Sequence, residues 1–217
     1  RDETVTTLLL RSYARNISTT AANTSILRDI RANTDIGETT FYEYVAALKK
    51  LFVIQDIEAW CPAIRSKSSI QSGNKREFVD PSLVVSALGV EPDYFNLDLK
   101  TFGFIFETLC IRDLKIYSNA LGGRVSYYRD RYGLEADCVL HLRDGKYALI
   151  EFKLGSSEID EGAKHLNEIE KLVEEYNKTE KQCLLRAPDL KIVITGTQYG
   201  YKRPDGVYVV PIGCLRD

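Results

Sequence analysis

The sequence predicts an α/β (α+β) protein in which a helical first part precedes a part built on a sheet. Apolar residues recur at helical spacing through the first 51 residues. Further along, two strand-like runs at residues 136–142 and 146–153 flank a short turn, and a helix-like run follows at 158–176. We therefore expect two domains, at residues 1–99 and 100–217.

Three helices are expected to open the chain, at residues 5–17, 25–32 and 40–51. Thr40 and Glu43 have the spacing of a capping box, which satisfies backbone donors at the start of the third helix. The apolar residues of this helix recur at helical spacing and are expected to pack inward: Phe41, Tyr44, Val45, Leu48 and Phe52. A strand is expected to follow at residues 52–57.

Three helices followed by a strand resemble a winged-helix unit, in which the third helix often enters the major groove of DNA. The candidate contact residues on this helix are Tyr42, Lys49 and Lys50. Glu38 and Glu43 share the same surface, so its charge is mixed. DNA reading and protein packing therefore both remain open as uses of the helix.

A loop rich in serine is expected at residues 61–75, and Arg65 and Lys67 within it are candidate phosphate contacts. A short helix is expected at residues 82–88. The segment at 89–99 then forms a connector, where we place the boundary between the two domains.

The second domain is expected to begin with a buried helix at residues 101–117, because this segment is apolar nearly all round. Glu107 lies on the same stripe as Phe104 and Ile111, and a carboxylate in that position needs a partner. The alternatives are an ion pair, for example with Arg129, and a third carboxylate beside a metal site. Arg129 is also a candidate nucleic-acid contact.

The turn at residues 143–145 sets the register of the central hairpin. A two-residue Asp-Gly loop would pair Asp137 with Phe152, whereas a three-residue loop with Gly145 in the left-handed region pairs Asp137 with Glu151. The second register collects alternating apolar residues on one face and the charged residues on the other. We therefore expect Asp137 and Glu151 to oppose each other.

Two opposed carboxylates repel each other unless a positive charge lies between them. A divalent cation such as Mg²⁺ favours one or two carboxylates together with water and phosphate oxygens. Lys153 shares the face of Glu151 and could steady an attacking water or a developing negative charge. The alternative is an ion pair of Lys153 with Glu151 or Asp137 that needs no metal, and the pattern alone leaves both open.

Asp137, thirteen intervening residues and then Glu151-Phe152-Lys153 resemble the motif of the PD-(D/E)XK nuclease superfamily, with Ala136 in place of the proline. The predicted order of helix, three strands, helix and strand is similar to the αβββαβ, restriction-endonuclease-like core of that superfamily. The resemblance implies that Asp137, Glu151, Lys153 and Glu107 are catalytic. It also implies that Asp137 and Glu151 hold Mg²⁺ or Mn²⁺.

Nearly the whole chain resembles the C-terminal half of a family of bacterial and archaeal AAA+-type ATPases. The resemblance is carried by Phe106-Glu107, Tyr128-Arg129, Glu135-Ala136-Asp137, Glu151-Phe152-Lys153 and a late stretch with Gly200, Tyr201, Asp205, Gly206 and Val207. It implies that an ATP-binding module lies N-terminal to this chain, as its partner in a longer protein. Two functions follow as alternatives: Mg²⁺-dependent hydrolysis of DNA, and a catalytically inactive scaffold or binding module of the ATPase.

The composition limits the remaining possibilities. The net charge of −2 argues against a tight, sequence-independent coat on nucleic acid. No apolar run approaches the ~20 residues of a membrane span, so no membrane partner is expected. The five cysteines are scattered and include Cys110 and Cys138 in apolar segments, which favours reduced thiols and a cytoplasmic location. The chain carries no G-x-x-x-x-G-K-[ST] phosphate loop, and its oligomeric state is not indicated.

Overall fold

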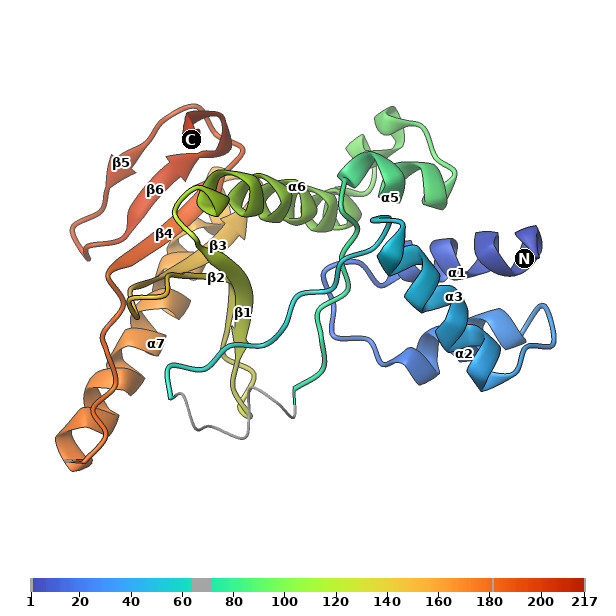
Figure 1. The fold of residues 1–217 in the computed structure, drawn as a ribbon. Helices are drawn as coiled ribbons and strands as arrows, with labels where there is room; N and C mark the ends of the chain where they lie inside the picture. The colour runs from blue at the N-terminus through green and yellow to red at the C-terminus, as the bar shows by residue number, and fades with distance from the viewer. Residues whose placement is uncertain (1, 64–71, 181, 217) are drawn as a thin grey trace. The chain divides into compact units, whose positions relative to one another are not determined.

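The computed structural model describes residues 2–63, 72–180 and 182–216, and its chain forms two compact units (Figure 1). The first unit consists of Arg1–Ile57 and Gly73–Leu109, and the second of Glu58–Ser72 and Cys110–Asp217. The units therefore do not follow a single cut at residue 99, because a segment between the two parts of the first unit belongs to the second. The fold is mixed α/β, as predicted, with the first three helices preceding the sheet.

The first unit opens with the three predicted helices, α1 (Glu3–Arg15), α2 (Asn23–Arg31) and α3 (Glu38–Lys50). The side chain of Asp2 accepts hydrogen bonds from the first backbone N–H groups of α1, which fixes the start of this helix. Four residues predicted to face inward from α3 are buried in the core of this unit: Phe41, Tyr44, Val45 and Leu48.

Phe52 is a correction to the prediction, because 75% of its surface is exposed. Helix α3 ends at Lys50, one residue before the predicted end, and Phe52 has a positive φ of 54°. The N–H of Phe52 bonds to the carbonyl of Lys49, and the N–H of Val53 bonds to that of Leu48. These two hydrogen bonds form a Schellman motif, in which the position of Phe52 is usually a glycine. The motif turns the side chain of Phe52 away from the apolar face of the helix.

The strand expected at residues 52–57 is found as an irregular pairing rather than a regular strand. Ile54 and Ile57 form isolated antiparallel bridges with Phe78 and Lys75, respectively. The chain then continues through α5 (Pro81–Leu88), the short helix η1 (Pro92–Asn96) and α6 (Leu99–Asn119). Helix α6 contributes to both units, because the division falls between Leu109 and Cys110.

The second unit contains a six-stranded sheet with the strand order β1-β2-β3-β4-β6-β5. Its strands are β1 (Arg124–Arg129), β2 (Glu135–His141), β3 (Tyr147–Lys153), β4 (Leu190–Thr195), β5 (Tyr201–Lys202) and β6 (Tyr208–Pro211). The first three strands are antiparallel, β3, β4 and β6 run parallel, and β5 is antiparallel to β6. The predicted order of helix, three strands, helix and strand is present, and β5 and β6 follow it.

Helix α7 (Ile159–Thr179) follows the short helix η2 (Ser156–Glu158), and η3 (Ile212–Cys214) follows β6. Buried residues of α7 share one apolar cluster with residues of the sheet, among them Leu166, Ile169, Val139 and Leu149. Strand β3 is buried at every position but its last, so both of its faces are covered. Cys110 and Cys138 are buried, as predicted.

The outer edge of β1 is covered by a short segment that precedes it by more than sixty residues in the chain. Ala59 forms a parallel bridge with Tyr127, whose N–H donates to the carbonyl of Glu58 at 3.2 Å. The N–H of Trp60 donates to the carbonyl of Tyr127 at 2.7 Å. The ring of Trp60 also lies 4.6 Å from that of Tyr147, which anchors the segment on the sheet. None of the described helices has the length and apolar character needed to cross a membrane.

Candidate active site

The central hairpin has the predicted register. Strand β2 pairs with β3 through Cys138↔Ile150 and His141↔Tyr147, and the N–H of Leu142 donates to the carbonyl of Lys146 at 2.8 Å. Gly145 has the expected positive φ, 85°. The pairs end at Cys138↔Ile150, and the same register continued by one residue would set Asp137 opposite Glu151 rather than opposite Phe152.

The Asp137 carboxylate marks the point where β2 separates from β3. The pairing of these strands ends at Cys138, whereas β2 continues along β1 through Ala136↔Tyr128. The N–H of Phe152 donates to Oδ2 of Asp137 at 2.9 Å, so this side chain takes the place of a backbone acceptor. The hydrogen bond holds the carboxylate on the side of the hairpin where the two strands diverge.

Glu151 is almost completely buried, with 2% of its surface exposed. Its Oε2 lies 3.2 Å from Nζ of Lys153 and 3.7 Å from Nδ1 of His165. Burial alone would lower the pKa of Lys153, but the carboxylates of Glu151 and Asp137 outweigh it and raise that pKa above its ordinary value. Lys153 is therefore an ammonium at neutral pH and serves as a hydrogen-bond donor, not as a base.

Helix α7 covers the charged face of the hairpin, and Gly162 permits its close approach. A Cβ atom at position 162 would lie 3.1 Å from Cε of Lys153 and 3.3 Å from Cβ of Glu151. His165 lies three residues further along α7, on the same side of the helix, which brings its ring to Glu151. From the sequence, His165 is expected at the surface, with a part in proton transfer as the alternative. The spacing between Gly162 and His165 is the signal that could have placed it at the site.

Glu107 lies in the first unit, and its partner there is Lys75. The two charged atoms are 2.6 Å apart, and both side chains are buried. The suggested ion pair of Glu107 with Arg129 is wrong, because Arg129 instead pairs with Glu135 at 3.0 Å. The role of Glu107 as a third carboxylate beside the metal site stays a prediction.

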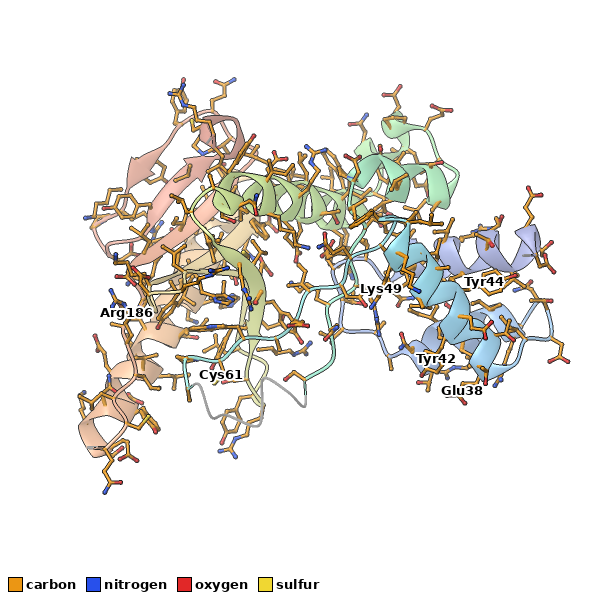
Figure 2. All side chains as sticks on the ribbon, in the orientation of Figure 1. Glu38, Tyr42, Tyr44, Lys49, Cys61 and Arg186 are labelled. Atoms are coloured by element: carbon orange, nitrogen blue, oxygen red, sulfur yellow. The ribbon has the colours of Figure 1, made fainter. Side chains whose placement is uncertain are left out.

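The nucleic-acid contacts expected from the sequence are mostly engaged elsewhere or lie outside the described residues. Lys49 pairs with the buried Asp56 at 2.8 Å, and Arg129 pairs with Glu135. Tyr42 and Lys50 are exposed on α3, where Tyr42 lies on the same end of the helix as the acidic Glu38 (Figure 2). Arg65 and Lys67 fall outside the residues that the structure describes. The exposed surface of α3 therefore keeps the mixed charge seen in the sequence.

A second group of charged residues was missed because their partners come from distant parts of the chain. Lys75, Arg76 and Glu77 are consecutive and buried. Arg76 donates to the buried Asp56 at 2.9 Å, and Glu77 accepts hydrogen bonds from Ser18 and Thr108. Their pairing shows that these charges support the first unit from within, although the sequence placed Lys75 and Arg76 in or beside a solvated loop.

The donor set at the hairpin suits a hard divalent cation, because Asp137 and Glu151 offer carboxylate oxygens on adjoining strands. Within the described part of the chain, however, no group of three or more His, Cys, Asp or Glu side chains is arranged to hold a metal. Any ion here would rest on two carboxylates completed by water or substrate oxygens.

Family models match both the first and the second part of the chain. A family model described as a domain of unknown function (DUF8612) matches residues 1–94. No curated protein and no solved structure matches the chain. A second model, described as a domain of unknown function (DUF4143), matches residues 102–215, which is more than half of the chain. The protein that carries this hairpin therefore belongs to the DUF4143 family.

Proposed function

We propose that this chain is the C-terminal part of an ATPase-associated protein and that its sheet unit hydrolyses phosphodiester bonds of DNA with Mg²⁺ or Mn²⁺. The observations that support the proposal are the register of the hairpin, which would oppose Asp137 and Glu151 if it continued by one residue, and the ion pair of Lys153 with Glu151. The likeness of the sequence to the C-terminal half of AAA+-type ATPases supports the association with an ATP-binding module.

Each residue has a distinct part in the proposed reaction. Asp137 and Glu151 would hold the ion, and opposed carboxylates gain most from a cation because their repulsion is relieved. A bound divalent ion polarises the scissile phosphate and lowers the pKa of its water. Lys153 stays protonated, so its ammonium donates to the attacking water or to the phosphate oxygens as negative charge develops.

The experiment is titration of Mg²⁺ and Mn²⁺ by calorimetry, followed by incubation with labelled DNA. Asp137→Asn retains an acceptor for the Phe152 N–H but removes one of the two opposed charges. It should weaken metal binding steeply and leave the fold intact. Asp144→Asn is the matched control, because Asp144 is an exposed residue of the hairpin turn paired with Lys146. The proposal fails if the wild type binds neither ion, or if both variants lose affinity equally.

A second candidate is an inactive scaffold or binding module, and the burial of Glu151 against Lys153 and α7 favours it. In this case Lys153 is the permanent counter-ion of the site. Lys153→Ala separates the two functions. For an enzyme, metal binding persists while cleavage falls by roughly 10²-fold or more. For a scaffold, no metal binds, and the free energy of unfolding falls by about 3–5 kcal/mol because buried carboxylates lose their partner.

A further inference from the structure

Two exposed tyrosines lie at the outer edge of the sheet. Tyr199 is 77% exposed and Tyr201 is 49% exposed, and they are separated only by Gly200. Tyr201 belongs to β5, the last strand in the sheet order, which is seen at the edge of the sheet in Figure 1. The next residue, Lys202, is also exposed, and its ammonium lies 5.0 Å from the centre of the Tyr208 ring. Tyr201 and Lys202 are consecutive residues of one strand, so their side chains lie on opposite faces of the sheet, and Lys202 shares its face with Tyr208.

The backbone that presents these tyrosines is fixed from both sides. A Cβ atom at Gly200 would lie 3.2 Å from Cδ of Pro211 and 3.3 Å from the carbonyl oxygen of Val209, so the chain packs directly on β6. Tyr201 pairs with Val209 in the ladder. Just beyond β5, Arg203 donates to Asp160 at 2.6 Å, which ties this segment to the start of α7. Ordered backbone lowers the entropy lost when a ligand binds.

The tyrosines follow directly from the end of the sheet where Lys153 lies. Lys153 pairs with Thr195, the last residue of β4, and the segment that carries Tyr199 begins immediately after it. A Cβ atom at Gly196 would lie 2.9 Å from the carbonyl oxygen of Leu154, so the two chain segments leave the sheet in contact. Ligands of parallel sheets bind outside the carboxyl ends of the strands, and here that end leads from Lys153 to Tyr199.

We propose that Tyr199 and Tyr201 stack on the bases of single-stranded nucleic acid. The inference rests on the proposed function, since it names the form of substrate that would reach Lys153. Aromatic rings stack on any base, whereas the bases of a duplex are already stacked on each other. The net charge of −2 excludes a broad basic coat, so stacking is the main source of affinity at this surface.

The inference is tested by measuring the binding of a fluorescein-labelled oligo(dT) of about 15 nucleotides through its fluorescence anisotropy. EDTA is present to remove divalent ions, so that no cleavage takes place. The double variant Tyr199→Ala/Tyr201→Ala should weaken binding about tenfold or more, while Tyr199→Phe/Tyr201→Phe should bind like the wild type. Tyr132→Ala is the matched control. Tyr132 is 80% exposed beside Arg131 in the turn between β1 and β2, far from β5 in the strand order.

The outcomes separate this inference from the proposed hydrolysis. Unchanged affinity in the double alanine variant overturns it, as does equal weakening by Tyr132→Ala or equal binding of a blunt duplex. Absence of oligo(dT) binding by the wild type at low salt also overturns it. If the wild type binds oligo(dT) through the tyrosines but never cleaves DNA with Mg²⁺ or Mn²⁺, hydrolysis fails and the binding surface stands. If it cleaves DNA while the tyrosine variants bind normally, only the stacking surface fails.

Discussion

The ammonium of Lys153 lies 3.2 Å from Oε2 of Glu151, and the carboxylate side chain of this pair is only 3% exposed. The pair thus neutralises a charge that would otherwise be costly inside the unit. Asp137, opposite Glu151, adds a second negative charge to the field that Lys153 experiences. The stability of the sheet unit and the chemistry of the site consequently depend on the same ammonium group.

The first prediction concerns alkaline pH. Because the folded pKa of Lys153 is raised above 10.5, the folded state holds its proton more tightly than the unfolded chain does. Its contribution is therefore fully present below pH 10.5 and is lost as the pH rises through the folded pKa. Urea unfolding at about pH 8 and about pH 11.5 should show a smaller alkaline loss for Lys153→Met than for the wild type. Equal losses would contradict the prediction.

The second prediction compares two helical glycines. Gly103→Ala in α6 should stabilise the protein by about 0.5–1 kcal/mol, because alanine favours helix and nothing lies within 4 Å of the added methyl group. Gly162→Ala in α7 should lack this gain, since the methyl group meets Lys153 and Glu151. It should also displace the Lys153 ammonium and reduce any DNA cleavage. Chemical denaturation and cleavage assays check both variants, and equal stabilisation of the two would refute the close approach of α7.

The third prediction concerns the buried pair in the first unit. Lys75→Met removes the charge 2.6 Å from Glu107 and should lower the free energy of unfolding by about 3–5 kcal/mol. The double variant Lys75→Met/Glu107→Leu should lose less than Lys75→Met alone, because no buried carboxylate is left without its counter-ion. Urea denaturation of the wild type, Lys75→Met, Glu107→Leu and the double variant measures the coupling. Strict additivity would show that the pair does not interact.

The fourth prediction uses Trp60, the single tryptophan of the chain, as a probe. Burial and then the nearby Arg124 lower the pKa of His141, whose ring lies 6.0 Å from that of Trp60. The unfolded chain therefore binds more protons than the folded one once the pH falls through 6.5, so stability is lost on acidification and levels off below the folded pKa. Unfolding followed by Trp60 fluorescence should show a smaller acid loss in His141→Gln. An identical pH dependence would count against a lowered pKa of the half-buried His141.

The register of the hairpin could be predicted because two local constraints agree. The turn needs a residue that tolerates positive φ, and Gly145 supplies it. The alternation of apolar and charged residues on the flanking strands then selects one of the two possible loops. The pairs from Cys138↔Ile150 to His141↔Tyr147 follow from these short-range patterns alone.

Contacts between distant segments were not predictable in the same way. The pairing of Lys75 with Glu107 joins residues 32 positions apart, and no local spacing signals it. The contact of His165 with Glu151 depends on how closely α7 approaches the sheet, which packing around Gly162 decides. Phe52 was misplaced because helical spacing assumes that the helix continues, whereas the chain leaves it after Lys50. The motif also does not distinguish an enzyme from a scaffold, because the same charged residues can bind a metal ion or form a structural ion pair.

The short segment at Ala59 and Trp60 has a consequence for how the sheet unit can be produced. Its hydrogen bonds to Tyr127 shield the outer backbone of β1, although it lies far before the boundary suggested by sequence. A fragment that began at residue 100 would leave these polar groups unpaired on an exposed edge strand. Such an edge is a template for pairing with other chains, so we expect that fragment to self-associate and precipitate unless the preceding segment is retained.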